Sequence, residues 1–288
     1  MITLAGTAVD AVSVAGLETS ICLPGLGCAL DMGVCRPTAV QRGTVLFTHA
    51  HIDHLGALAQ HCATRALLGM APPVYAVPEE NLAGVEALLD AWRRLDRSEL
   101  ACTLVPARPG TEVRLRRNTV ARAFRSIHRV PCLGWGIWET RTKLRAAFVG
   151  RPGTEIAAAR AAGEEITEAT TVPIVAFTGD SRVDVIDRED VLRQARLLIM
   201  EVTFLDDAVS VERSREMGHI HLDEVIERAD IFENEAILMT HNSARYSPET
   251  AKDIVMKRIP DVLRGRVHVL PNTRAFRPSA PPTAAAKQ

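Results

Sequence analysis

Residues 44–56 place three histidines and an aspartate within six positions, directly after an apolar run typical of a β-strand. Side chains along a strand point alternately to its two faces, so His49 and His51 should face the same way and bind one cation. An apolar pattern with helical spacing follows, and it places Asp53 and His54 at the start of a helix, displaced toward a second cation. Imidazole and carboxylate groups together suit Zn²⁺, with Mn²⁺ or Fe²⁺ as alternatives.

This His-x-His-x-Asp-His string resembles the signature of the metallo-β-lactamase superfamily. The resemblance implies an αββα sandwich, in which two sheets pack face to face with helices outside. The alternative is a chance cluster of histidines on a polar turn, and further ligands elsewhere in the chain argue against it.

Three more residues of the ligand types follow β-type runs later in the chain, namely His128, Asp180 and His241. Taken singly, each has an ordinary structural explanation as a strand-end histidine or a turn aspartate. Two neighbouring cations, however, need a bridging anion and one more ligand each. We therefore expect one cation on His49, His51 and His128, a second on Asp53, His54 and His241, and Asp180 between them. A hydroxide shared by the cations would be the nucleophile, since metal binding lowers the pKa of water.

Composition points to one globular domain. The chain has 288 residues, 47% of them hydrophobic, which is enough for a large core. Its net charge of −1 gives no overall signature of polyanion binding, so an RNA-binding surface would have to come from local clustering. The sequence shows no signal-peptide pattern, no apolar run long enough for a membrane span and no Cys-x-x-Cys pair. We expect a cytoplasmic protein with reduced thiols and no membrane contact.

The pattern of elements also fits an α/β sandwich, because β-type runs alternate with helical patterns in both halves of the chain. The expected helices cover residues 53–68, 79–95, 153–162, 188–195, 222–231 and 248–258. The expected strands are a meander over 2–31, a strand at 44–49, runs within 103–149 that end with one at 144–149, and strands at 172–177, 197–200, 236–240 and 266–270. We expect a single domain over residues 1–275. Residues 276–288 are rich in proline and alanine, which predicts a disordered tail.

Several segments narrow the resemblance within the superfamily. They are similar to the ribonuclease Z family of tRNA 3′-processing endoribonucleases, in its short plant-like form, and they extend over nearly the whole chain. The most specific are Met200-Glu-Val-Thr-Phe-Leu-Asp-Asp, Gly218-His-Ile-His and Thr240-His-Asn-Ser-Ala-Arg-Tyr-Ser. The resemblance implies a homodimer that removes 3′ trailers from precursor tRNA, with two Zn²⁺ per chain as cofactors.

The resemblance also implies catalytic roles beyond metal binding. Glu201, Thr203 and His219 match the family's acid-Thr-His element, in which a histidine oriented by the glutamate protonates the departing 3′-oxygen. Asp53 joins them among the catalytic residues, and His221 is the second choice for the acid. A ribose 3′-alkoxide is a poor leaving group, and a general acid contributes about 10²–10⁴-fold in rate.

A basic stretch offers a surface for the substrate. Residues 114–145 contain nine basic side chains and one acidic one, a local charge of +8, and they flank His128. Phosphate contacts of this kind supply affinity without reading sequence. The alternative is a solvated β-surface with counter-ions. The expected substrate-binding residues are Arg116, Arg117, Arg122 and Arg125, together with Ser243 and Arg245.

Two departures from the family pattern concern the grip on the substrate. The turn at residues 16–20 lacks the Pro-x-Lys-x-Arg-Asn loop of many relatives. Only 51 residues separate His128 from Asp180, so we expect the tRNA-binding arm usually inserted there to be contracted. The alternative function is a hydrolase of the same fold acting on a small phosphodiester, lactam or lactone, and the pair Glu201 and His219 argues against it. A non-catalytic RNA-binding protein is a further alternative, and the intact ligand set argues against that one.

Overall fold

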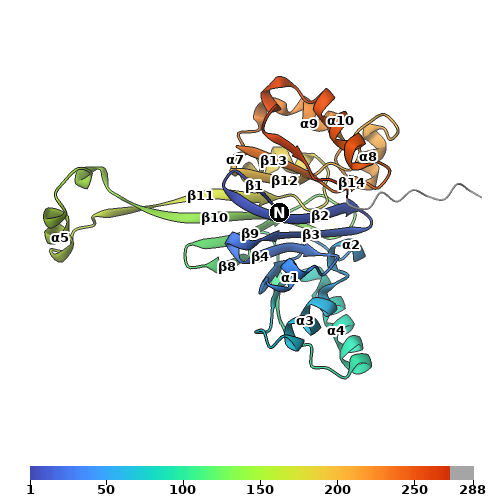
Figure 1. Cartoon of the computed structure of the whole chain (residues 1–288), viewed down its shortest axis with the longest axis horizontal. Helices are drawn as coiled ribbons and strands as arrows, with labels where there is room; N and C mark the ends of the chain where they lie inside the picture. Colours follow the sequence, from blue (N-terminus) through green and yellow to red (C-terminus); the bar gives the residue numbers. More distant parts are fainter. Residues whose placement is uncertain (273–288) are drawn as a thin grey trace, which may run out of the picture.

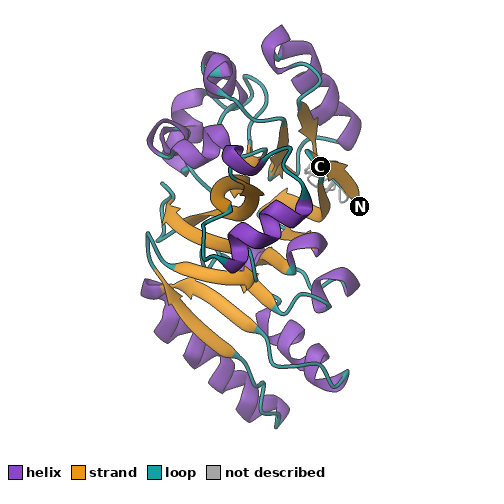
Figure 2. Cartoon of the chain, turned by 90° about the vertical axis from the view of Figure 1, so that its left-hand side faces the viewer, coloured by secondary structure: helices purple, strands orange, loops and turns teal. Residues whose placement is uncertain are grey.

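The computed structural model describes residues 1–272. Two mixed β-sheets face each other with helices on both outer sides, which confirms the four-layer α/β sandwich expected from the sequence (Figure 1, Figure 2). The expected tail at residues 276–288 lies outside the described residues. Within residues 1–272 no helix is long and apolar enough to cross a membrane.

The first sheet comes mainly from the N-terminal part of the chain and has the strand order β1-β2-β3-β4-β5-β6-β7, with β14 beside β2. The first four strands form the expected antiparallel meander, and β4 to β7 are parallel. These strands are β1 (Ile2–Leu4), β2 (Thr7–Ala15), β3 (Glu18–Leu23), β4 (Cys28–Met32), β5 (Thr44–Leu46), β6 (Val74–Pro78), β7 (Thr103–Ala107) and β14 (Asn242–Ser243). The helices on its outer face are α1 (Pro37–Val40), α3 (Leu58–Leu67) and α4 (Leu82–Asp96).

The second sheet has the strand order β15-β13-β12-β11-β10-β9-β8. Strands β8 to β11 are antiparallel, and β11, β12, β13 and β15 are parallel. The strands are β8 (Glu112–Arg116), β9 (Thr119–Arg125), β10 (Leu133–Leu144), β11 (Thr167–Phe177), β12 (Leu197–Glu201), β13 (Ala236–Thr240) and β15 (Val267–Val269). The helices on its outer face are α6 (Asp184–Arg188), α7 (Asp190–Gln194), α8 (Val211–Met217), α9 (Leu222–Glu227) and α10 (Pro248–Arg258).

Side chains of the central strands divide the core into layers. In β12, Leu197 and Ile199 pack between the two sheets, whereas Leu198 and Met200 pack under the helices of the second sheet. Alternate side chains point to opposite faces, so a strand covered on both sides must be apolar throughout. This explains the unbroken apolar run that ends at Met200, directly before a buried Glu201.

Some boundaries differ from the sequence predictions. The helix expected over residues 53–68 is divided into α2 (Ile52–Leu55) and α3, because the Ala57 amide donates to the Met32 carbonyl in β4 at 3.0 Å instead of continuing the helical ladder. The strand expected at 144–149 is wrong, since residues 146–148 form a 3-10 turn. Strand β6 and helix α8 were missed.

Strands β10 and β11 continue beyond the sheet as a hairpin that projects from the body (Figure 1). β10 pairs with β9 only as far as Glu139, whereas its pairing with β11 extends to Leu144, opposite Thr167. Residues 140–171 therefore form an arm of their own. The expectation of a contracted arm is corrected for its reach but not for its number of residues. The segment is short in sequence, but extended strands advance about 3.3 Å per residue and carry it far from the body.

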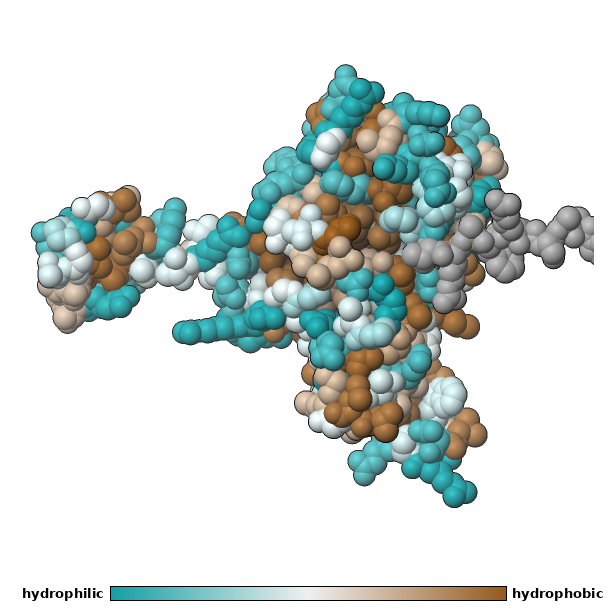
Figure 3. Space-filling model, in the orientation of Figure 1, coloured by the Kyte–Doolittle hydropathy of each residue, from teal (hydrophilic) through white to brown (hydrophobic). Residues whose placement is uncertain are grey.

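A small cluster closes the tip of the arm. Helix α5 (Gly153–Ala161) lies there, and Phe148 and Ile166 are buried close to it. Apolar side chains are exposed on the surface of the tip (Figure 3). Val149, which precedes α5, is 68% exposed. The arm thus carries its own packing and an apolar outer surface.

Removing the arm should leave the stability of the body unchanged, because no residue between 140 and 171 belongs to the buried clusters of the sandwich. We expect a variant in which Asn-Gly replaces residues 141–170 to melt within about 4 °C of the wild type in calorimetry. A larger fall would mean that the arm supports the core.

Candidate metal centre

The candidate site lies at one edge of the sandwich, where strands from both sheets reach their carboxyl ends. Loops that follow parallel strands share an edge, which is where α/β proteins commonly place their sites. Strands β4, β5, β11, β12 and β13 supply side chains at or shortly after these ends, and the residues are Asp31, His49, Asp180, Glu201 and His241.

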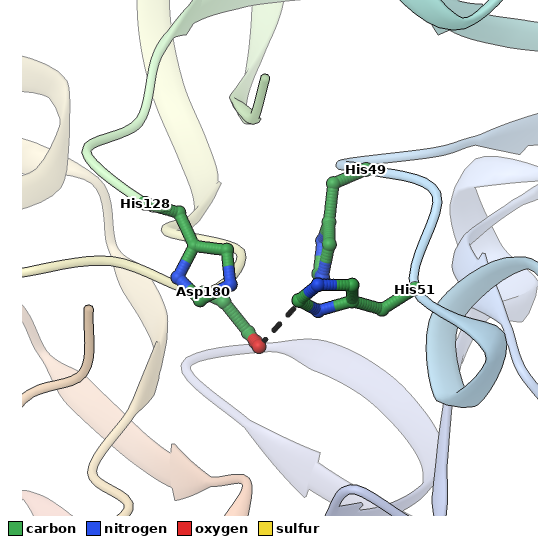
Figure 4. A group of neighbouring side chains, drawn as sticks. All are labelled: His49, His51, His128 and Asp180. Carbon is green, nitrogen blue, oxygen red and sulfur yellow. Dashed lines mark ion pairs between the residues drawn. The ribbon is translucent and has the colours of Figure 1, made fainter. Parts of the chain in front are cut away.

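One group of ligand-type side chains consists of His49, His51, His128 and Asp180 (Figure 4). Their ligand atoms all lie within 4.8 Å of one another. The ring centroids of His49 and His51 are 4.5 Å apart, and each is 5.2 Å from the His128 centroid. The strand that precedes them ends at Leu46, so the first two histidines converge from a loop rather than from the strand that the sequence predicted.

A second group consists of Asp53, His54 and His241. The Asp53 Oδ2 atom lies 3.4 Å from His241 Nε2 and 3.5 Å from His54 Nε2. Asp180 reaches this group as well, with 3.3 Å from Oδ1 to His54 Nε2 and 3.5 Å from Oδ2 to His241 Nε2. Its Oδ2 is also 3.8 Å from His49 Nε2, so one carboxylate faces both groups.

The donor atoms fit divalent cations in spacing and in chemistry. Zinc bonds of 2.0–2.2 Å in a tetrahedral shell place neighbouring ligand atoms about 3.4 Å apart, close to the separations around Asp180. The Nε2 atoms of His49 and His128 are buried without a hydrogen-bond partner among residues 1–272. Buried polar atoms normally have a partner, so these two nitrogens are directed at something that the protein does not supply.

The outer nitrogens of four histidines are held by hydrogen bonds that fix the rings. Each Nδ1 binds an oxygen, which leaves the Nε2 lone pair free to bind a metal. The contacts are His49 to Thr48 Oγ1 at 2.9 Å, His54 to Asp31 Oδ2 at 2.8 Å, His128 to the Gly218 carbonyl at 2.9 Å and His241 to Thr203 Oγ1 at 3.1 Å.

Asp31 is a functional candidate that sequence reasoning missed. It is fully buried and accepts hydrogen bonds from the Thr48 amide at 2.7 Å, from the Thr48 hydroxyl at 2.8 Å and from His54. It therefore orients one histidine of each group. Its φ of 57° lies in the left-handed region, a strained conformation that often marks functional residues. The available signal was its place at the end of an apolar run whose parallel neighbour, β5, leads to His49.

The carboxylates set the charge on the histidines. Burial opposes a charge on His54, but Asp180 and Asp31 outweigh it and raise its pKa well above the ordinary value. Burial and the neighbouring His54 lower the pKa of His49 well below the ordinary value. Burial also opposes ionisation of Asp180, yet the surrounding histidines hold its pKa below its usual range. A field that favours a proton on His54 also favours a metal cation at this position.

Glu201 and His219 form a pair at the border of the two groups, and a ligand atom of His219 lies within 4.8 Å of those of Asp180 and His241. His219 Nδ1 donates to Glu201 Oε1 at 2.8 Å, and its ring lies 5.2 Å from His128 and 5.4 Å from His241. Burial opposes a charge on His219, but Glu201 outweighs it, and the pKa of His219 rises to about 9. Thr203 donates to Glu201 Oε2 at 2.7 Å, so it links the pair to His241.

The alternative acid, His221, serves the helix instead. Its Nδ1 accepts from the Asp223 amide at 3.2 Å, and its own amide donates to the Glu224 side chain at 3.0 Å. These contacts form a capping box at the start of α9. Its Nε2 lies 3.1 Å from the Asp206 carbonyl, and His221 belongs to neither ligand group.

The basic residues do not form one surface beside the ligands. This corrects the expectation of a local charge of +8 next to His128. Arg116 and Arg117 lie beyond the start of β9, whose seven residues separate them by about 20 Å from the end that leads to His128. Four other cations have acidic partners, most of them from outside residues 114–145. The pairs are Arg122 with Glu112 at 2.6 Å, Arg141 with Glu139 at 2.6 Å, Lys143 with Glu168 at 3.0 Å and Arg145 with Glu165 at 3.3 Å.

The remaining predicted substrate residues lie nearer to the ligands. Arg125 ends β9 and lines a cleft together with His128. Arg245 Nε donates to Ser243 Oγ at 3.2 Å, and its guanidinium lies 5.5 Å from the centroid of the Phe204 ring. Ser243 and Arg245 follow His241 closely, so they stay near the second group.

Comparisons with known proteins agree with this geometry. A family model described as a beta-lactamase superfamily domain matches residues 33–242. The chain is 40% identical over 268 residues to tRNase Z TRZ1 of Arabidopsis thaliana, covering 92% of this chain and 95% of that protein. It is 36% identical over 275 residues to tRNase Z TRZ2, chloroplastic, of the same plant, covering 94% and 76%. The crystal structure of human tRNase Z, short form, shares the fold, with a TM-score of 0.56, 19% identity and coverage of 82% and 93%.

Replacing Asp31 with asparagine should weaken metal binding, because the variant keeps the shape of the side chain and removes the charge that holds His54 and Thr48. Mutation of such outer partners typically costs about 10–100-fold in metal affinity. Zinc affinity of Asp31→Asn, measured by chelator competition, should fall by this factor, whereas the exposed Asp90→Asn on α4 should bind like the wild type. Equal affinities for the two variants would contradict the role of Asp31.

Proposed function

The chain belongs to the tRNase Z family of metallo-β-lactamase-fold hydrolases, and from that premise we propose that it removes 3′ trailers from precursor tRNA and leaves a 3′-hydroxyl. The observation that carries the proposal is the Glu201–His219 pair beside the two ligand groups. Hydrolysis of a lactam or lactone does not require an acid at this position, whereas a ribose 3′-oxygen leaves poorly without one.

The proposed ligands divide between two cations. Their nitrogen-rich donor set favours Zn²⁺, with Mn²⁺ or Fe²⁺ as alternatives. When bound, such cations supply an activated water and offset the charge of the scissile phosphate. The proposed ligands are His49, His51 and His128 for one cation, Asp53, His54 and His241 for the other, and Asp180 for both.

The protein's own residues position the reaction. His219 donates its Nδ1 proton to Glu201, and because its pKa is raised to about 9 the ring also carries a proton on Nε2 at neutral pH, which is available to the departing 3′-oxygen. Glu201 holds this orientation through a second bond from the Ser181 amide at 2.9 Å. The Gly16 amide donates to Asp53 Oδ2 at 2.9 Å and fixes that carboxylate as well. Acid and ligands are therefore set before the substrate arrives, which avoids reorganisation during the reaction.

The arm suggests how the tRNA is held. The site lies at the near ends of β10 and β11, and the arm begins at Thr140, about 23 Å along β10 from Leu133. We infer that the arm contacts a tRNA whose trailer is cut by a second copy of the chain, in a homodimer. The cytoplasmic location expected from the sequence stays a prediction, because one relative is named as chloroplastic.

The catalytic pair can be tested with a precursor tRNA that carries a 3′ trailer. Single-turnover cleavage by His219→Ala should be about 10²–10⁴-fold slower, because this variant loses the acid. Cleavage by Glu201→Gln should be about tenfold or more slower, because the acid loses its orientation. His221→Asn is the matched control, since asparagine also caps a helix, and it should cleave like the wild type. A slow His221→Asn with a fast His219→Ala would reverse the assignment.

Use of the arm between copies can be tested by complementation. The armless variant retains its site, and His219→Ala retains its arm, so each homodimer should cleave precursor tRNA poorly. After subunit exchange about half of the dimers are mixed. In each mixed dimer the arm of the His219→Ala subunit serves the intact site of the armless subunit, so one of two sites works and about a quarter of wild-type activity should return. A mixture no more active than its two components would contradict the inference.

A further inference from the structure

A cleft opens beside His128, outside the groups of metal ligands. It is formed by the loop that follows β9 and by the residues Glu80 and Pro109 opposite it. Two exposed arginines line the cleft, namely Arg125 at the end of β9 and Arg129 in the loop. The side of the cleft nearest the proposed cations is His128 itself, so the cleft is a direct extension of the site.

The floor of the cleft is bonded to the backbone of the turn that presents Asp180. Ser126 Oγ donates to the Thr178 carbonyl at 2.7 Å and lies 3.2 Å from the Asp180 carbonyl. Cys132 Sγ also contacts the Asp180 carbonyl, at 3.4 Å. Both ends of the loop are therefore fixed to the turn that presents Asp180. Arg125, directly before the loop, and Arg129, within it, thus have a defined place relative to the site.

Arg129 lies next to the proposed general acid. An added Cβ at Gly218, the residue before His219, would come within 3.2 Å of Arg129 Cγ and 2.8 Å of His128 Nδ1. The aliphatic part of the Arg129 side chain thus packs against Gly218, which lies between the proposed acid His219 and the metal ligand His128. A larger residue at position 218 would displace both side chains, and the φ of +82° disfavours one there as well.

The two arginines differ from the cations of the basic stretch that have acidic partners. Among residues 1–272, neither Arg125 nor Arg129 has an ion pair or a side-chain hydrogen bond, whereas Arg122 is held by Glu112. Two unpaired cations beside a site proposed to hold further cations repel them, unless an anion lies between. Guanidinium groups bind phosphate oxygens in paired hydrogen bonds, which makes an RNA strand the fitting anion.

We propose that this cleft binds the backbone phosphates that neighbour the scissile phosphate, with Arg125 and Arg129 as the contacts. The inference rests on the proposed function and names the part of the substrate that the site holds beyond the reacting bond. The strand leaves the site past His128, along the apolar surface of Pro109, Val130 and Pro131. Contacts of this type add affinity and register and do not read sequence.

The test measures how strongly RNA inhibits the hydrolysis of a small phosphodiester at the same site. Hydrolysis of bis(p-nitrophenyl) phosphate reports on the site of the metal-loaded enzyme, and precursor tRNA competes for it. We expect the inhibition constant of the RNA to rise about tenfold for each arginine replaced in Arg125→Ala and Arg129→Ala. The dependence of its logarithm on the logarithm of salt concentration should fall by about 0.7 per lost phosphate contact.

A matched control removes the same charge elsewhere. Arg196→Ala with Arg264→Ala deletes two arginines that do not line the cleft and that are paired with Glu235 and Asp261, and its inhibition constant and salt dependence should equal those of the wild type. Two further competitors show which part of the RNA strand lies in the cleft. If the arginine variants weaken inhibition only by an acceptor-stem minihelix that carries a trailer, the cleft holds the trailer. If they also weaken inhibition by a minihelix without the trailer, the cleft holds the acceptor end.

The proposal is overturned if the double variant and the control give the same inhibition constant and the same salt dependence. It is also overturned if RNA does not inhibit the wild type. Failure of the proposed function looks different: the wild type would hydrolyse the small diester and be inhibited by RNA, yet leave the trailer of the precursor uncut.

Discussion

The burial of several carboxylates close together is the constraint on which the site depends. Asp31, Asp180 and Glu201 are at most 2% exposed, and buried charges are tolerated only when they are paired and hydrogen-bonded. Asp31 and Glu201 are surrounded by amides, hydroxyls and imidazoles of the protein. Within residues 1–272, the polar neighbours of the Asp180 carboxylate oxygens are the inner nitrogens of histidines. Cations between these groups would complete the balance of charge, and their binding would therefore stabilise the fold.

The architecture explains why the site forms only when both sheets are in place. His49 follows a strand of the first sheet, Asp180 and Glu201 come from the second, and His241 lies between β13 and β14, which joins the first sheet beside β2. His241 has a φ of 56° at this crossing. A strained residue persists when its surroundings fix it, and here the Ser13 hydroxyl accepts the His241 amide at 3.1 Å.

Sequence reasoning found what local pattern and strand ends determine, and it missed what pairing across the fold determines. His128, Asp180 and His241 could be predicted because each follows a recognisable strand. Asp31 was missed, because its role depends on contacts with Thr48 and His54 that only the folded sheet brings to it. The break between α2 and α3 likewise depends on a carbonyl of β4, and the reach of the arm depends on strand register rather than on its number of residues. The positive charge beside the ligands was overestimated because most acidic partners of the basic residues come from outside residues 114–145.

The central claim is that these side chains hold two cations that share one carboxylate. The most direct measurement is a crystal structure of the metal-loaded protein, with anomalous scattering recorded at the absorption edge of the bound metal. The account predicts two peaks per chain, about 3.5–4 Å apart, on either side of Asp180. A single peak, or two peaks that do not contact Asp180, would contradict it.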